Sequence, residues 1–159
     1  MSGKGTPATI AATRAKIDFT LHAYDAEAQH GYGEEAAQAL GIGPERIFKT
    51  LVAEVDGTMT VAVVPVSGSL DLKALAAAAG GKKAQMADPA AAERTTGYVR
   101  GGISPLGQRK RLPTVIDAAA LDLPTIHVSA GRRGLEIELA PGDLVRLTSA
   151  RTAPISRAD

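Results

Sequence analysis

Residues 101–111, with the letters GGISPLGQRKR, combine glycines, one hydroxyl and a run of cations, a combination that could bind an anion. Glycines let backbone N–H groups converge at dihedral angles that other residues avoid, which creates a site for an anion or an oxyanion. The segment differs from a P-loop, because Gln108 and Arg109 follow Gly107, and from a nucleophile elbow, because Pro-Leu-Gly follows Ser104. The alternative is a plain tight turn after a helix.

Lys49 is the most informative single side chain. It lies in a strand-like run in which every second residue shares one face, and its companions on that face are apolar: Ile47, Leu51 and Ala53. One interpretation is a lysine near a strand end, whose alkyl stem packs while its ammonium group reaches water. The other is a partly buried cation that binds or polarises an anionic or carbonyl group.

Other polar residues are candidates for a functional site, but their spacing matches no known catalytic or metal-binding motif. Three hydroxyls could serve a site, but the sequence reveals no adjacent base for any of them: Thr50, Ser104 and Ser129. The histidines His22, His30 and His127 lack the spacing of metal ligands, so the sequence predicts neither a metal site nor a cofactor. Two acids, Glu136 and Glu138, alternate with apolar residues, which is typical of a half-buried strand whose acids face solvent.

Composition narrows the class of protein. The chain has 159 residues, a net charge of +1, three tyrosines, two phenylalanines, and neither tryptophan nor cysteine. This length corresponds to a single domain over residues 1–159, and the few aromatic residues argue against a protein that stacks single-stranded bases. Without cysteine there can be no disulfide, thiolate ligand or protein thiol nucleophile. No long apolar run marks the first residues, so we expect no membrane span and a cytoplasmic location.

The cations are unevenly placed despite the small net charge. Four of them have no acid among them and flank the glycine segment: Arg100, Arg109, Lys110 and Arg111. Arg132 and Arg133 form a second cluster. Such runs are either a solvated surface or a set of contacts to phosphates.

The predicted elements mix helices and hairpins. Helices are expected after Thr6-Pro7 and over residues 33–40, 71–79, 87–96 and 141–149, and strands over residues 19–25, 46–55, 59–66, 113–117, 125–129 and 135–139. The Asp56-Gly57 pair predicts a hairpin between two of these strands. The strand over residues 59–66 is apolar on both faces, which predicts a central position. The pattern favours an α+β fold over a regular βαβ array.

Three segments together resemble the YbaK family: FKTLV around Lys49, residues 82–117, and residues 128–144. The likeness extends over nearly the whole chain. The family consists of bacterial trans-editing deacylases that clear misacylated Cys-tRNA(Pro), and it is related to the insertion domain of bacterial prolyl-tRNA synthetase. The resemblance implies a compact α+β domain with a mixed, mostly antiparallel sheet and flanking helices.

The resemblance also implies roles for individual residues. Lys49 would hold the aminoacyl ester and the tRNA 3′ end. The other pocket residues would be Tyr24, Thr50 and Ser129, and the loop facing the ester carbonyl would be Gly101, Gly102, Ile103 and Ser104. Glu136 stands where relatives tend to have Asp, so its carboxylate lies one methylene further out. The cations expected to follow the tRNA backbone are Arg100, Arg109, Lys110, Arg111 and Arg132.

The chemistry implied by the family explains the missing protein nucleophile. The substrate's own cysteine thiol would attack its ester carbonyl, and a cyclic thiolactone would leave the ribose oxygen, so the enzyme could be classed as a lyase. The implied partners are aminoacylated tRNA(Pro) and, in a ternary complex, prolyl-tRNA synthetase. Cys-tRNA(Cys) stays open as a further substrate. Two alternative functions also stay open: deacylation of another amino acid such as alanine from tRNA(Pro), and a non-catalytic module that binds tRNA or a synthetase.

Overall fold

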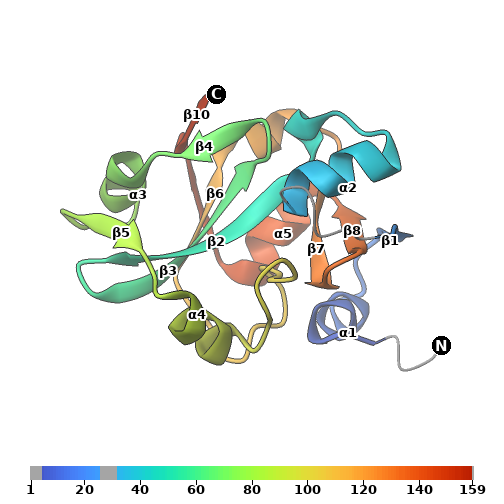
Figure 1. Cartoon of the computed structure of the whole chain (residues 1–159), viewed down its shortest axis with the longest axis horizontal. Coiled ribbons are helices and arrows are strands. Elements are labelled where there is room, and N and C mark those ends of the chain that lie inside the picture. Colours follow the sequence, from blue (N-terminus) through green and yellow to red (C-terminus); the bar gives the residue numbers. More distant parts are fainter. Residues whose placement is uncertain (1–4, 26–31, 159) are drawn as a thin grey trace.

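Helices and strands alternate irregularly along the part of the chain that the computed structural model describes, residues 5–25 and 32–158 (Figure 1). The α-helices are α1 (Pro7–Arg14), α2 (Tyr32–Leu40), α3 (Leu72–Ala78), α4 (Pro89–Thr96) and α5 (Pro141–Thr148). The strands are β1 (Phe19–Ala23), β2 (Phe48–Val55), β3 (Thr58–Pro65), β4 (Gly68–Leu70), β5 (Ala84–Met86), β6 (Thr114–Asp117), β7 (Ile126–Arg132), β8 (Leu135–Leu139), β9 (Arg151–Ala153) and β10 (Ser156–Ala158). Two short 3-10 helices are η1 (Pro44–Arg46) and η2 (Ala118–Asp122).

The strands form three sheets. The largest has the order β5-β2-β3-β6-β9, in which β3 pairs antiparallel with β2 and parallel with β6, and β6 pairs parallel with β9. A second sheet, β1-β8-β7, is antiparallel throughout, and β10 pairs with β4. An isolated bridge between Ile47 and His127 brings the start of β2 against β7. In Figure 1 the long strand β2 runs across the molecule toward β7 and β8. The expected α+β fold with a mixed, mostly antiparallel sheet is confirmed.

The core explains why β3 is central. Val61 and Val63 on one face of β3 pack into a cluster with the three-stranded sheet, α1 and α5. Ala62 and Val64 on the other face pack against α3. All four side chains are fully buried, so the strand needs apolar residues on both faces. The central position predicted from its sequence is confirmed.

Local signals set most of the element ends. The side chain of Asp88 caps α4 by accepting the N–H of Ala91, with Pro89 in the first turn, and Gly97 ends the helix in the left-handed conformation. Asp56 and Gly57 both have positive φ, as the hairpin turn between β2 and β3 requires. The predicted strand over residues 19–25 ends earlier, at Ala23. Strands β4, β5, β9 and β10 were not predicted, because three residues carry too little periodicity.

The helices of the described residues are also short. None of them is both long and apolar enough to cross a lipid bilayer.

Candidate active site

A cavity lies beside the part of strand β2 that pairs with β3 but not with β5. Strand β5 pairs with β2 only from Ala53 to Val55, so the described residues provide no strand partner on that side for the first half of β2. The cavity has a volume of about 270 Å³. Its walls come from β2, the start of α4, the glycine loop, β7 and β8. The lining residues are Tyr24, Ile47, Phe48, Lys49, Thr50, Leu51, Val52, Met86, Ala87, Pro89, Ala92, Arg100, Gly101, Ile103, Ser129 and Glu136.

The structure therefore brings together most of the residues that the sequence singled out. Eight of them line this one cavity: Tyr24, Lys49, Thr50, Arg100, Gly101, Ile103, Ser129 and Glu136. They come from separate elements, so the cavity exists only in the folded chain. Six others do not line it: Gly102, Ser104, Arg109, Lys110, Arg111 and Arg132.

Strand β2 contributes a cation and a hydroxyl to the cavity wall, from the consecutive residues Lys49 and Thr50, whose side chains lie on opposite faces of the strand. Lys49 is half-buried, and it is a member of the cavity wall. The hydroxyl of Thr50 is buried and has no hydrogen-bond partner among the described residues. A buried hydroxyl without a partner is unfavourable by about 1–3 kcal/mol, so such groups in native proteins usually point to a missing ligand or water. Thr50 is thus a ready hydrogen-bonding group for whatever enters the cavity.

The loop requires glycine at positions 101 and 102, for different reasons. Gly101 has a φ of 91°, a conformation that other residues adopt only with strain. Gly102 lies so close to the backbone of Arg132 that a Cβ added at Gly102 would be 2.7 Å from the Cα of Arg132. The N–H of Gly102 donates to the carbonyl of Val99 at 2.9 Å, so this donor is used inside the loop. Only Gly101 and Ile103 of the loop, together with Arg100, reach the cavity.

Ser104 has a structural position. Its side chain is fully buried, and its hydroxyl oxygen accepts the N–H of Leu106 at 3.2 Å. Its carbonyl accepts the side-chain amide of Gln108 at 3.0 Å. The hydroxyl is therefore engaged in the turn that follows the loop, away from the cavity wall.

Glu136 corrects an expectation from the sequence. The alternation in β8 predicted acids that face solvent, yet Glu136 is only 6% exposed. It lies on the middle strand of its sheet, with His22 of β1 and Ser129 of β7 directly opposite. Burial raises the pKa of its carboxyl group to about 8, and none of the described ion pairs involves it. At neutral pH the site therefore holds a mostly protonated carboxylic acid that can donate a hydrogen bond.

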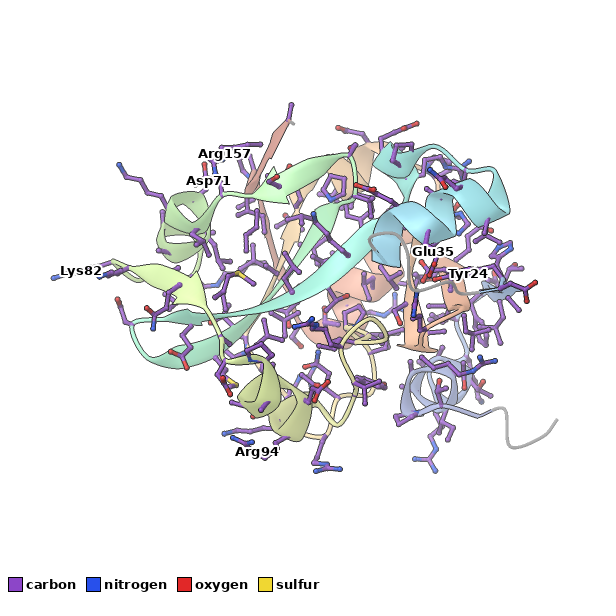
Figure 2. All side chains as sticks on the ribbon, viewed as in Figure 1. Tyr24, Glu35, Asp71, Lys82, Arg94 and Arg157 are labelled. Atoms are coloured by element: carbon purple, nitrogen blue, oxygen red, sulfur yellow. The ribbon has the colours of Figure 1, made fainter. Side chains whose placement is uncertain are left out.

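Tyr24 and Ser129 complete the polar end of the cavity. Burial raises the pKa of the Tyr24 phenol, and the negative charge of Glu136 adds to this effect. Figure 2 shows Tyr24 beside Glu35 of α2. The hydroxyl of Ser129 accepts the N–H of Gly131 at 3.1 Å, where the pairing register of β7 shifts in a bulge. Bulges often re-aim side chains next to functional sites.

The cations divide into those at the cavity and those elsewhere. Arg100 is exposed and lines the cavity. Lys110 and Arg132 are exposed outside it, and Arg109 is also exposed, with a weak contact to the carbonyl of Arg94 at 3.5 Å. Arg111 donates to the carbonyl of Leu147 and to the hydroxyl of Ser149 at the end of α5.

Arg133 has a different role from Arg132. Its guanidinium group forms a two-pronged contact with Glu35, at 2.9 and 3.1 Å, and so joins α2 to the β7–β8 turn. The second cationic cluster of the sequence is therefore split.

Sequence reasoning missed the apolar wall. Met86, Pro89 and Ala92, at the end of β5 and in the first turns of α4, line the cavity together with the polar residues. The Asp88-Pro89 cap signalled where the helix begins, but nothing local signalled what the helix covers.

Comparisons with known proteins identify a family and two similar proteins. The family model for the aminoacyl-tRNA editing domain matches residues 27–147. A protein of Enterococcus faecalis named "Putative Cys-tRNA(Pro)/Cys-tRNA(Cys) deacylase EbsC" is 43% identical over 142 residues, covering 89% of this chain and 87% of that protein. Bacillus subtilis has an "Uncharacterized protein YwhH" that is 27% identical over 111 residues, or 70% of this chain and 71% of that one.

Solved structures share the fold. The structure described as a "putative trans-editing enzyme for prolyl tRNA synthetase" has a TM-score of 0.86 at 24% identity, with 99% of each chain covered. On the family match and the close relative, the chain belongs to the aminoacyl-tRNA editing domain family, the YbaK family.

Proposed function

We propose that residues 1–159 form one trans-editing deacylase domain that removes cysteine from mischarged Cys-tRNA(Pro), acting in the cytoplasm. The observation that carries the proposal is the cavity whose wall includes Lys49, Thr50 with its unpartnered hydroxyl, and the buried acid Glu136. Its volume is slightly below the usual range for small-ligand sites, about 300–1,000 Å³, so it fits an aminoacyl group and part of its ribose. The rest of the tRNA would lie on the surface.

The lining of the cavity suits an ester of a small amino acid. The apolar wall of Met86, Pro89 and Ala92 would pack against the side chain and exclude water. Lys49 and the Thr50 hydroxyl would bind the ester and stabilise negative charge that develops on the carbonyl oxygen. The protonated Glu136 would donate a hydrogen bond, and because it needs no counter-ion it would also tolerate an apolar surrounding.

The reaction needs a nucleophile that the chain does not supply. It contains no cysteine, and the Ser104 hydroxyl is buried in a turn. In the proposed step the substrate thiol sulfur attacks the carbonyl carbon, a C–S bond forms, and the ester C–O bond breaks. The thiol proton ends on the ribose oxygen, and cysteine thiolactone leaves. Thiols ionise near pH 8.5 and intramolecular attack gains from proximity, so positioning and charge stabilisation suffice.

The proposed partner is aminoacylated tRNA(Pro). Selectivity for this tRNA would come from a ternary complex with prolyl-tRNA synthetase. One structural neighbour is described as a trans-editing enzyme for that synthetase. Exposed Arg109, Lys110 and Arg132, and Arg100 at the cavity mouth, would contact the tRNA backbone.

A deacylation panel with Cys-, Ser-, Ala- and Pro-tRNA(Pro) tests the proposal. Cys-tRNA(Pro) should be cleaved fast and Ser-tRNA(Pro) slowly, because a hydroxyl is a far weaker nucleophile than a thiol. An apolar pocket cannot by itself reject so similar a side chain strongly, so a large difference in rate would point to the substrate thiol as the nucleophile. Cysteine thiolactone should appear before free cysteine.

Each other outcome of the panel points to a different mechanism or a different function. Equal rates for serine and cysteine, with free cysteine as the first product, would mean that water is the nucleophile. Preferential release of alanine would identify an alanine deacylase. Binding of tRNA without release of any amino acid would identify a non-catalytic module.

A further inference from the structure

A second polar cluster lies on the same sheet as the candidate active site but outside its cavity. It consists of His22 from β1, His127 from β7 and Glu138 from β8. One possible ligand atom from each residue lies within 4.8 Å of the other two. This cluster was not predicted from the sequence, because His22 and His127 lie far apart in the chain.

The distances in the cluster suit a shared ion. Nε2 of His22 is 2.9 Å from Oε1 of Glu138, and Nε2 of His127 is 3.9 Å from Oε2 of the same carboxylate. The second separation is too long for a hydrogen bond. Zinc binds histidine nitrogen and carboxylate oxygen at about 2.0–2.2 Å, so two ligands of one ion lie roughly 3–4 Å apart. Small shifts of His22 and Glu138, which are 29% and 25% exposed, would complete the geometry.

His127 has no hydrogen-bond partner, within residues 5–25 and 32–158, for the nitrogen that faces the cluster. Its side chain is 2% exposed, and its ring makes no hydrogen bond with the described residues. One nitrogen, Nδ1, is buried without a partner, and the other faces Glu138 across the 3.9 Å gap. A neutral imidazole nitrogen offers a lone pair to a metal ion. An ion in this gap would give Nε2 a partner, which a buried polar group in a native protein usually has.

Two neighbours already compete for the carboxylate. The hydroxyl of Thr125 donates to Oε2 of Glu138 at 2.6 Å, and Nη2 of Arg46 lies 3.9 Å from the same oxygen. Arg46 also donates to the Thr125 hydroxyl at 3.3 Å. Its side chain is 38% exposed, so it can swing into solvent when a cation arrives.

We propose that His22, His127 and Glu138 bind one divalent ion of the zinc class. Two imidazoles and one carboxylate are a donor set that such ions prefer, with the remaining coordination positions left to water. The ion would join all three strands of the β1-β8-β7 sheet. It would therefore stabilise the sheet that also carries Ser129 and Glu136. The inference is independent of the proposed deacylase activity.

The first test is a titration of zinc into the full chain after treatment with EDTA, using a chromophoric chelator as competitor. We expect one ion per chain and a rise in the melting temperature, because an ion that binds only the folded state stabilises it. Cobalt in place of zinc should give visible absorption bands of a low-symmetry site. Absence of a saturable site, or of any melting shift, overturns the proposal.

Variants assign the ligands. His22→Gln and Glu138→Gln, at half-exposed positions that need not disturb folding, should each weaken zinc binding by at least about 10-fold. Glu54→Gln, at a half-buried acid in β2, is the matched control and should bind zinc like the unchanged protein. Equal affinity in all four proteins would place the ion elsewhere and overturn the proposal.

Arg46→Ala separates an ion site from a purely structural network. If the cluster binds zinc, removal of this competing cation should tighten binding severalfold and lower the dissociation constant. Unchanged or weaker zinc binding in folded Arg46→Ala would mean that the ion does not share the carboxylate that Arg46 contacts, and would overturn the assignment of Glu138 as a ligand.

Discussion

Glu136 and Glu138 lie two residues apart on the same face of β8, yet their surroundings give them opposite properties. Glu136 lines the cavity, is nearly inaccessible, and burial raises its pKa to about 8. Glu138 lies outside the cavity, where hydrogen bonds from Thr125 and then His22 lower its pKa. Two residues of a strand span only about 7 Å. Over this short distance the protein changes from an environment that favours the neutral acid to one that favours the carboxylate.

The difference separates two kinds of polar site on one sheet. At the cavity end, polar groups are buried with few partners, as expected of a site that completes its contacts with a ligand. At the other end, the carboxylate already has donors and a neighbouring cation. Measurements at each position therefore test whether the two environments differ in this way.

The largest expected effect is on stability at the cavity end. Glu136 holds its proton in the folded state up to about pH 8, whereas in the unfolded chain it loses the proton near pH 4.5. The free energy of unfolding should therefore fall between pH 4.5 and 8, by several kcal/mol at about 1.4 kcal/mol per pKa unit. Glu136→Gln should lack this fall. Chemical denaturation with EDTA present measures it, with Glu54→Gln as control.

A fall of equal size in Glu136→Gln and the unchanged protein would show that another group is responsible. The two ends of β8 would then be less different than their burial indicates.

The next effect is on catalysis. Lys49→Ala should reduce deacylation of Cys-tRNA(Pro) by about 10²–10³-fold, the loss typical of one donor to a developing oxyanion. Lys49→Arg should not restore the rate, because a planar guanidinium group differs in shape and reach from an ammonium group. Lys73→Ala, at an exposed lysine of α3 away from the cavity, is the matched control. Near-normal turnover in folded Lys49→Ala would contradict the assignment.

A smaller effect of opposite sign is expected outside the cavity. Because hydrogen bonds lower the pKa of Glu138 in the folded state, its stabilising effect should be present above pH 4.5 and be lost as the pH falls through the lowered value. Glu138→Gln should reduce the free energy of unfolding at pH 7 by about 1 kcal/mol, as for partly exposed hydrogen bonds to a charged group. Denaturation at pH 7 and pH 3 without metal should show the difference shrinking at pH 3. A difference that grows at low pH would reverse the comparison.

The smallest effect concerns cations inside and outside the cavity. Arg109→Ala and Lys110→Ala should weaken tRNA binding modestly and flatten its salt dependence by about 0.7–0.9 in slope for each lost phosphate contact. Arg100→Ala, at the cavity wall, should in addition raise the KM for the aminoacylated tRNA. Filter binding at several salt concentrations gives the slopes. Unchanged slopes for Arg109 and Lys110 would leave them as a solvated surface.

Much of the fold followed from local patterns. The apolar run in β3 predicted burial on both faces, the Asp56-Gly57 pair predicted the hairpin, and Asp88, Pro89 and Gly97 marked the ends of α4. In each case the stabilising contacts lie within a few residues, or the pattern itself requires cover on both faces. Strands β4, β5, β9 and β10 could not be predicted, because each depends on pairing with a distant segment.

The candidate site divides in the same way. The odd position of Lys49 on an apolar face and the unusual glycine loop were visible in the sequence, and both contribute to the cavity wall. The hydroxyl of Ser104 and the N–H of Gly102 also looked available, but the structure uses them inside the loop. A residue type shows which bonds a group can form, whereas only its neighbours show whether those bonds are already made.

The order of the amino acids is enough to establish which residues alternate, where turns must form, and that the chain has no thiol of its own. The tertiary structure alone decided the charge of Glu136 and the meeting of His22 with His127. The period of a strand fixes which side chains share a face, but the cover on that face comes from segments far away in the chain. Because desolvation and hydrogen bonding act through space, the pKa of a carboxyl group and the ligands around a gap depend on those segments.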